Sequence, residues 1–136
     1  MRVTFTPTGD SAVTLADSSA APLIAGVLEQ FGGASLVQTE KRYGQSTEID
    51  FPRGNIGGDF IFTAGCSYAT LDAAAGAFAA AFALLNEQGS LAFTPNPAGS
   101  VTLTMANAIL RDVHRVKWDG VRLELRYTFK ITTITT

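Results

Sequence analysis

The chain has 136 residues, of which 46% are hydrophobic and 16% charged, with a formal net charge of −2. This length suits a single domain spanning residues 1–136 with one core, and the hydrophobicity excludes a disordered tail. The small net charge excludes a general attraction to nucleic acid or acidic lipid. One cysteine excludes an internal disulfide bond. The longest apolar run, residues 73–85, is shorter than the ~20 residues that span a bilayer, so we expect no membrane partner.

The N-terminal part of the chain is predicted to form strands. Val3, Phe5, Val13 and Leu15 alternate with threonines, which is the two-residue period of half-buried strands. The first residues lack the apolar segment of a signal peptide, so we expect the chain to fold where it is made. Residues 22–31 predict a short strand or turn that ends at two glycines.

A polar arm is predicted over residues 37–58. Residues 35–43 and 46–51 suit a pair of polar strands, and residues 52–58 (PRGNIGG) predict a loop because proline lacks an N–H donor and glycine favours positive φ. A strand then begins at Phe60. The charged candidates for interaction in and beside this arm are Glu40, Lys41, Arg42, Glu48, Asp50, Arg53 and Asp59.

One Ala-rich helix is predicted over about residues 71–86. Thr70 suits the N-cap, Asp72 lies in the first turn, and Gly89 is placed to end the helix. The bulky side chains share one face, which we expect to pack on a sheet, and small residues occupy the opposite face. That second face is either exposed to solvent or approached by a neighbouring subunit. The bulky face consists of Leu71, Phe78, Phe82 and Leu85.

The rest of the chain predicts a strand meander. Residues 91–93 and 101–105 alternate across a Pro-Asn-Pro-Ala-Gly loop, and the alternation slips by one residue near Asn107, which predicts a β-bulge. The predicted fold class is therefore α+β and mostly β: packed antiparallel sheets or a partly closed barrel, with one helix.

The strongest local signal is Asp119-Gly120, which predicts a two-residue type I′ turn in a C-terminal hairpin over residues 108–132. This register opposes Trp118 to Val121 and Leu110 to Phe129 on an apolar face. The other face gathers six basic residues and a single acid, Glu124. The predicted basic face consists of Arg111, Arg115, Lys117, Arg122, Arg126 and Lys130.

Three roles for the basic face remain open. The three candidates are a solvated surface, a surface that pairs with acidic residues of another copy, and a site for nucleic-acid phosphate. No aromatic residues interleave with the cations, so the stacking platforms of single-strand binders are absent from the pattern.

No catalytic motif is present in the sequence: it contains no G-x-S-x-G, Walker A or G-x-G-x-x-G pattern. His114, near Asp112, is predicted to be a half-buried structural histidine. Cys66 precedes the helix, whose dipole could lower its pKa, but a small buried residue is the favoured interpretation. One histidine and one cysteine cannot build a tetrahedral metal site. We therefore expect no enzymatic activity, no cofactor and no metal.

The run GDFIFTAGCSYATLDAAAGAFAAAFALLNEQGSLAF, with the later segments VTLTMANAILRDV and GVRLELRYTFKI, spans over half of the chain. A strand, a helix of small residues and a meander ending in an alternating aromatic strand resemble the tail-tube and distal-tail proteins of bacteriophages and related injection machines. The resemblance implies a virion component, assembled in the bacterial cytoplasm into rings of identical copies. Its partners would be other copies of itself and other tail proteins, with the arm bridging neighbouring subunits.

The resemblance further implies that the basic face contacts a neighbour, since a surface lining a DNA passage is expected to be acidic or neutral. The C-terminal residues 131–136 keep strand propensity, so they either pair with another chain or fray. The sequence thus predicts a structural assembly protein. The alternative is a nucleic-acid-binding module that uses the hairpin's basic face.

Overall fold

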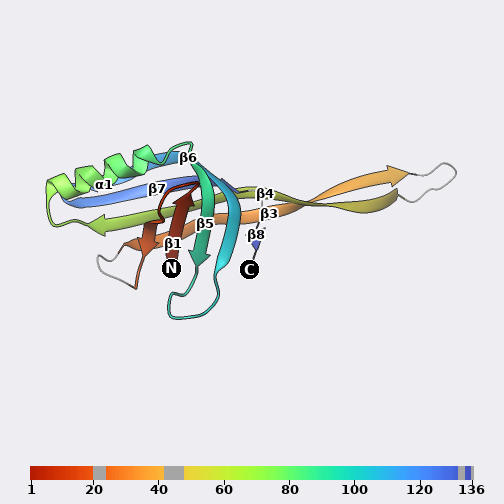
Figure 1. Cartoon of the computed structure of the whole chain (residues 1–136), viewed down its shortest axis with the longest axis horizontal. Helices are drawn as coiled ribbons and strands as arrows, with labels where there is room; N and C mark the ends of the chain where they lie inside the picture. Colours follow the sequence, from red (N-terminus) through yellow and green to blue (C-terminus); the bar gives the residue numbers. More distant parts are fainter. Residues whose placement is uncertain (20–23, 42–47, 132–133, 136) are drawn as a thin grey trace.

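The computed structural model describes residues 1–19, 24–41, 48–131 and 134–135, with side chains for residues 1–19, 24–32 and 58–131. Within them the chain is mostly strand with one helix (Figure 1). This confirms the predicted fold class. The elements are β1 (Arg2–Pro7), β2 (Val13–Asp17), β3 (Ala25–Lys41), β4 (Glu48–Ser67), α1 (Leu71–Ala83), β5 (Gln88–Thr94), β6 (Leu103–Asp119), β7 (Arg122–Ile131) and β8 (Ile134–Thr135).

The strands form one antiparallel sheet in the order β2-β1-β5-β6-β7-β4-β3, and β8 pairs with β6. The sheet is strongly curled. Strands three places apart would lie about 14 Å from each other in a flat sheet, yet the rings of Phe5 on β1 and Phe129 on β7 are 5.0 Å apart. Among the described residues, one isolated bridge links Asp17 at the end of β2 to Ile24 just before β3. The sheet therefore curls without closing into a barrel.

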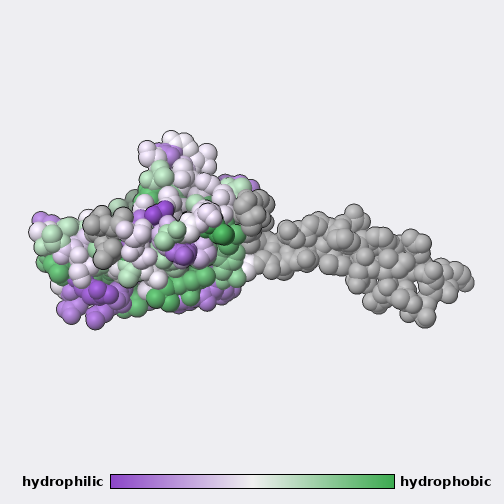
Figure 2. All heavy atoms as spheres, turned by 90° about the horizontal axis from the view of Figure 1, so that it is seen from below, coloured by the Kyte–Doolittle hydropathy of each residue, from purple (hydrophilic) through white to green (hydrophobic). Residues whose placement is uncertain are grey.

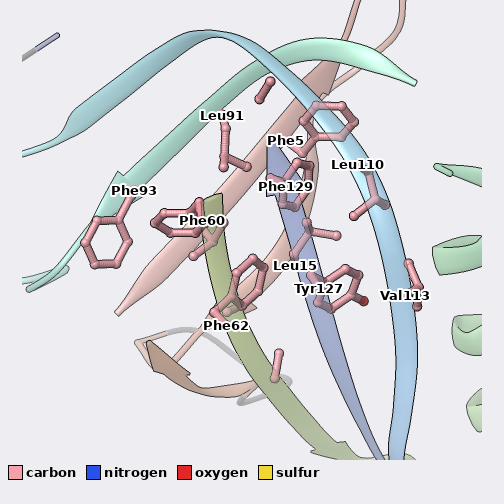
Figure 3. Packing of buried hydrophobic residues seen from close by; sticks show 14 of the residues in the cluster. Phe5, Leu15, Phe60, Phe62, Leu91, Phe93, Leu110, Val113, Tyr127 and Phe129 are labelled. Atoms are coloured by element: carbon pink, nitrogen blue, oxygen red, sulfur yellow. The ribbon is translucent and has the colours of Figure 1, made fainter. Parts of the chain in front are cut away.

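The core fills the concave side of this curl (Figure 3). Phe60 on β4 contacts Phe93 on β5 at 5.3 Å, and Phe62 stacks on Tyr127 at 5.1 Å. β1 and β7 supply alternate residues to this side, as the period of two requires. Burial of these aromatic rings is the main stabilising contribution to the fold.

The meander follows the predicted pattern. On β6, Ala106 and Asn107 are both exposed between buried Met105 and Ala108, and the β5–β6 register shifts there, which confirms the predicted bulge. The close pairing of β1 with β5 requires Gly89, because a Cβ atom at this position would overlap the carbonyl oxygen of Thr6. Gly89 therefore lies in strand β5. The prediction that it ends the helix is wrong.

The helix begins as predicted: the Thr70 hydroxyl accepts a hydrogen bond from the Ala73 N–H at 3.1 Å. It ends at Ala83, a turn earlier than predicted, and the chain reverses at Asn86, whose φ is +65°. The expectation that its bulky face packs on the sheet is only partly met: Phe78 and Leu85 pack against the core, but Leu71 and Phe82 are exposed. Ala74 and Ala81 are buried in their place. No helix in the described ranges is long and apolar enough to cross a membrane.

The loop predicted over residues 52–58 is instead part of the long strand β4. This strand pairs with β3 from Ala25↔Gly65 to Lys41↔Glu48, and register shifts absorb the irregular positions. Pro52 is tolerated because β4 pairs with β7 only over Asp59–Ser67, so no second strand needs the missing donor. Gly32-Gly33 likewise does not end β3.

Residues 34–41 and 48–56 pair only with each other. Figure 1 shows this part of β3 and β4 as a two-stranded ribbon that leaves the body of the molecule. We call it the extension. Its strands continue for about 26 Å at ~3.3 Å per residue, and they carry most of the predicted polar arm.

Candidate interaction surface

The predicted C-terminal hairpin is present, but its register near the turn differs from the prediction. Gly120, with a φ of +58°, and Val121 form the two-residue turn, and Asp119 pairs with Arg122. The predicted pair Leu110↔Phe129 is found. Two register shifts, beside Arg111 and Val116, then move the pairing by two residues before the turn. The sequence pattern contained no signal for these bulges.

The bulges redistribute the six predicted cations. Arg122, Arg126 and Lys130 alternate with buried residues of β7, so they lie on the convex outer face of the sheet. Lys117, opposite Glu124, lies on this outer face too, and Arg111 joins it at the bulge. Arg115 is the exception: it is exposed, but it pairs with buried Leu125 and so belongs to the opposite face.

Three of the cations have acidic partners within the same chain. Arg126 Nε lies 2.8 Å from the Glu29 carboxylate on β3, which also accepts a hydrogen bond from the Thr63 hydroxyl. Arg122 contacts Glu124 at 3.0 Å, and Arg111 lies 3.9 Å from Asp59. All of these groups are substantially exposed, so each pair contributes at most about 1 kcal/mol to folding.

The outer face is therefore balanced in charge, contrary to the prediction of a strongly basic face. Its acids come from elements that the hairpin pattern alone does not bring together: Glu29 from β3 and Asp59 from β4. Around the hairpin, the five basic residues that the described structure places on it are Arg111, Lys117, Arg122, Arg126 and Lys130. The five acidic residues there are Glu29, Asp59, Asp112, Asp119 and Glu124. The pair Arg2 and Asp17 adds one charge of each sign on β1 and β2.

Glu29 was missed by the sequence reasoning. The available signal was a carboxylate in the apolar run over residues 22–31. Of the predicted arm residues, only Asp59 has a described side chain, and it joins the outer face. Arg42 lies outside the described residues. The other five lie on described backbone of β3 and β4, but their side chains are outside the described set: Glu40, Lys41, Glu48, Asp50 and Arg53.

The candidates for chemistry are not arranged as a catalytic site. His114 is exposed on the outer face opposite Arg126, so the prediction of a half-buried histidine is wrong. Cys66 is 3% exposed, and burial raises the pKa of its thiol despite the opposing effect of Arg122. This confirms its predicted role as a small buried residue. Within the described ranges, no group of three potential ligands could hold a metal.

Hydrophobic side chains also reach the surface of the body. Figure 2 shows hydrophobic and hydrophilic residues gathered in separate areas of the body seen from below. Phe82 on α1 is 43% exposed and packs on Phe78, which in turn contacts Trp118 at 5.2 Å. Val116, which bulges from β6, is 50% exposed.

The solved structures that resemble this fold include two injection-system proteins. One is the sheath/tube terminator of an extracellular contractile injection system (PVC) in its extended state, with a TM-score of 0.48, 12% identity, and coverage of 98% of this chain and 91% of that chain. The other is the tube-terminating cap of the anti-feeding prophage, with a TM-score of 0.46, 14% identity, and coverage of 98% and 86%. Both proteins are parts of injection machines, which is the class of protein that the sequence resembles.

No protein-family model matches the chain, and no curated protein matches it.

Proposed function

We propose that this chain is a non-enzymatic structural protein of a phage-tail-like particle, which assembles with copies of itself into a ring through the extension. The observation that carries the proposal is the pairing of residues 34–41 with 48–56 and with no other described strand. A lone two-stranded ribbon is marginally stable in water, and both of its outer edges present unpaired backbone groups. Another chain that pairs or packs with it supplies the missing stabilisation.

A ring follows from this arrangement by symmetry. The extension leaves one end of the body (Figure 1), and in this proposal it contacts the body of the next copy, which makes the contact head-to-tail. Repeated head-to-tail contacts close into a ring when the rotation between copies divides a full turn. The single domain over residues 1–136 would be the repeating unit. The resemblance to tail-tube and distal-tail proteins supports a place in the virion or a related particle.

The outer face fits a docking role better than a nucleic-acid site. Its five acids would repel phosphate as strongly as its five cations attract it. The same mixture of charges suits a protein partner with complementary charges, which gives specificity and orientation to the contact. We therefore expect no retention of the unmodified chain on immobilised DNA at physiological salt. Retention that is abolished by Arg122→Glu with Arg126→Glu, both on the outer face, would establish the alternative function.

The experiment that tests the proposal shortens the extension. Residues 34–56 are replaced by Asn-Gly, which joins paired Gly33 and Gly57 through a two-residue hairpin turn. Sedimentation velocity of both proteins is measured over a range of concentrations, with thermal unfolding to verify that the body folds. We expect the full chain to form oligomers and the shortened chain to remain monomeric. Oligomers of equal size from both proteins would contradict the role of the extension.

A further inference from the structure

A cavity of about 390 Å³ lies between α1 and the sheet, on the concave side. Its floor is formed by buried residues of β4 and β7, among them Cys66, Leu123 and Tyr127. One wall is the alanine face of α1, and exposed Val13 and Ala80 lie at the mouth. The volume is within the range of small-molecule sites, about 300–1,000 Å³.

The cavity exists because α1 presents mainly alanines to this region, with Leu84 at its C-cap as the long side chain in the lining. Ala77, Ala80 and Ala81 line the helix wall, whereas the bulky Phe78 and Phe82 lie toward Trp118, outside the lining. An interior packed to normal density would fill such a space with methyl and methylene groups. The cavity is open at its mouth, so a ligand can enter without unfolding the helix.

Tyr127 contributes a hydroxyl to this mostly apolar space, whose lining also includes Thr14, Tyr68 and Cys66. The residue is 6% exposed, and stacking on Phe62 at an interplanar angle of 17° fixes the direction of its ring. Figure 3 shows the Tyr127 hydroxyl at the edge of the phenylalanine cluster. Among the described residues the hydroxyl has no hydrogen-bond partner, although a buried tyrosine normally has one. The hydroxyl is not sealed off, because no described side-chain oxygen is both fully enclosed and unpaired.

The lining also determines the charge of the ligand. In the described part of the chain it contains no arginine, lysine, histidine, aspartate or glutamate. A charged ligand would therefore lose its hydration without gaining a counter-ion. Burial raises the pKa of the Tyr127 hydroxyl, with a smaller effect from Tyr68, so the hydroxyl remains protonated and can donate.

We propose that this cavity binds a small uncharged molecule, mainly aliphatic or aromatic, with one hydrogen-bond acceptor that meets the Tyr127 hydroxyl. The acceptor fixes the orientation of the ligand, and the apolar lining supplies most of the binding free energy. This site is separate from the extension and from the outer face, so the proposal does not depend on the assembly role.

The test uses two probes of nearly equal shape: 2-acetylnaphthalene, which carries a carbonyl acceptor, and 2-ethylnaphthalene, which does not. Their binding to the full chain is measured by titration calorimetry or saturation-transfer NMR. We expect both to bind, with the acetyl compound about 2- to 10-fold tighter because of one neutral hydrogen bond. Tyr127→Phe keeps the stacked ring and should remove this difference.

A matched pair of helix variants locates the site. Ala77→Leu fills the cavity and should abolish the binding of both probes, whereas Ala79→Leu, on the exposed face of the same helix, should leave both unchanged. Thermal unfolding verifies that both variants fold. Failure of either probe to bind near its solubility limit would overturn the site. Equal affinities for the two probes in the native chain, or equal loss in the two helix variants, would also overturn the proposal.

Discussion

Replacing Phe129 by alanine should strongly destabilise the protein. Phe129 is fully buried where β7 meets β1 across the curl, with its ring 5.0 Å from Phe5 and 6.3 Å from Phe62. Loss of a buried phenylalanine costs about 3–5 kcal/mol, since the transfer free energy is lost and a cavity remains. A domain is stable by only about 5–15 kcal/mol, so this is a large share of the total.

The matched control is Phe82→Ala, the same substitution at a side chain that is 43% exposed on α1. We expect it to cost under about 1.5 kcal/mol, because much of the ring is already in water. Urea unfolding of both variants at low protein concentration, monitored by Trp118 fluorescence and by circular dichroism, measures the difference. Equal destabilisation by the two variants would refute the conclusion that the curled sheet, and not the helix face, forms the core.

Three further predictions concern point substitutions. Gly89→Ala should lower the free energy of unfolding by about 3 kcal/mol, because the new Cβ atom overlaps the Thr6 carbonyl. Gly76→Ala, with open space around it on exposed α1, should raise the free energy of unfolding by about 0.5–1 kcal/mol. A urea titration that ranks the two variants otherwise contradicts this prediction. Hydrogen bonds from Ser19, with Arg2 nearby, lower the pKa of the Asp17 carboxyl. Its stabilising contribution is then complete above about pH 4–5 and lost as the pH falls through the lowered folded pKa. Melting temperatures of the native chain and Asp17→Asn should differ at neutral pH and converge in acid, and a constant difference would refute the assignment. Finally, Glu29→Gln with Glu124→Gln should make the outer face basic and increase retention on heparin, and unchanged elution would contradict the charge balance.

Local features of the fold could be predicted from the sequence. Thr70 caps the helix, the slip near Asn107 is a bulge, and the two-residue C-terminal turn lies one position from its predicted place. These features depend on neighbours within a few residues, so their signals are contained in short stretches of sequence. Residues 131–136 were expected either to pair with another chain or to fray, and this was wrong for Ile134, which lies opposite Met105 of the same chain.

The errors arose where distant segments determine the outcome. The glycines and proline of residues 52–58 predicted a loop, but pairing with β3 holds them in a strand. The hairpin pattern predicted a basic face because Glu29 and Asp59 reach it only through the order of β3, β4 and β7 in the sheet. The helix face was only partly right: residue size favoured burial of Phe82, which is exposed, whereas Phe78 and Leu85 of the same predicted face do pack against the core.

The cavity could not be predicted from the sequence either. It requires knowledge of which helix face meets which strands, and Tyr127 was expected only as one member of an alternating strand. Its significance depends on the alanines opposite it on α1. Such a juxtaposition of segments distant in sequence leaves no local pattern.

The most direct test of the assembly role is negative-stain electron microscopy of the concentrated, unmodified chain. The account predicts closed rings, or short stacks of rings, because each copy offers one extension and one body to its neighbours. A field of isolated monomer-sized particles at every concentration and salt condition would contradict it.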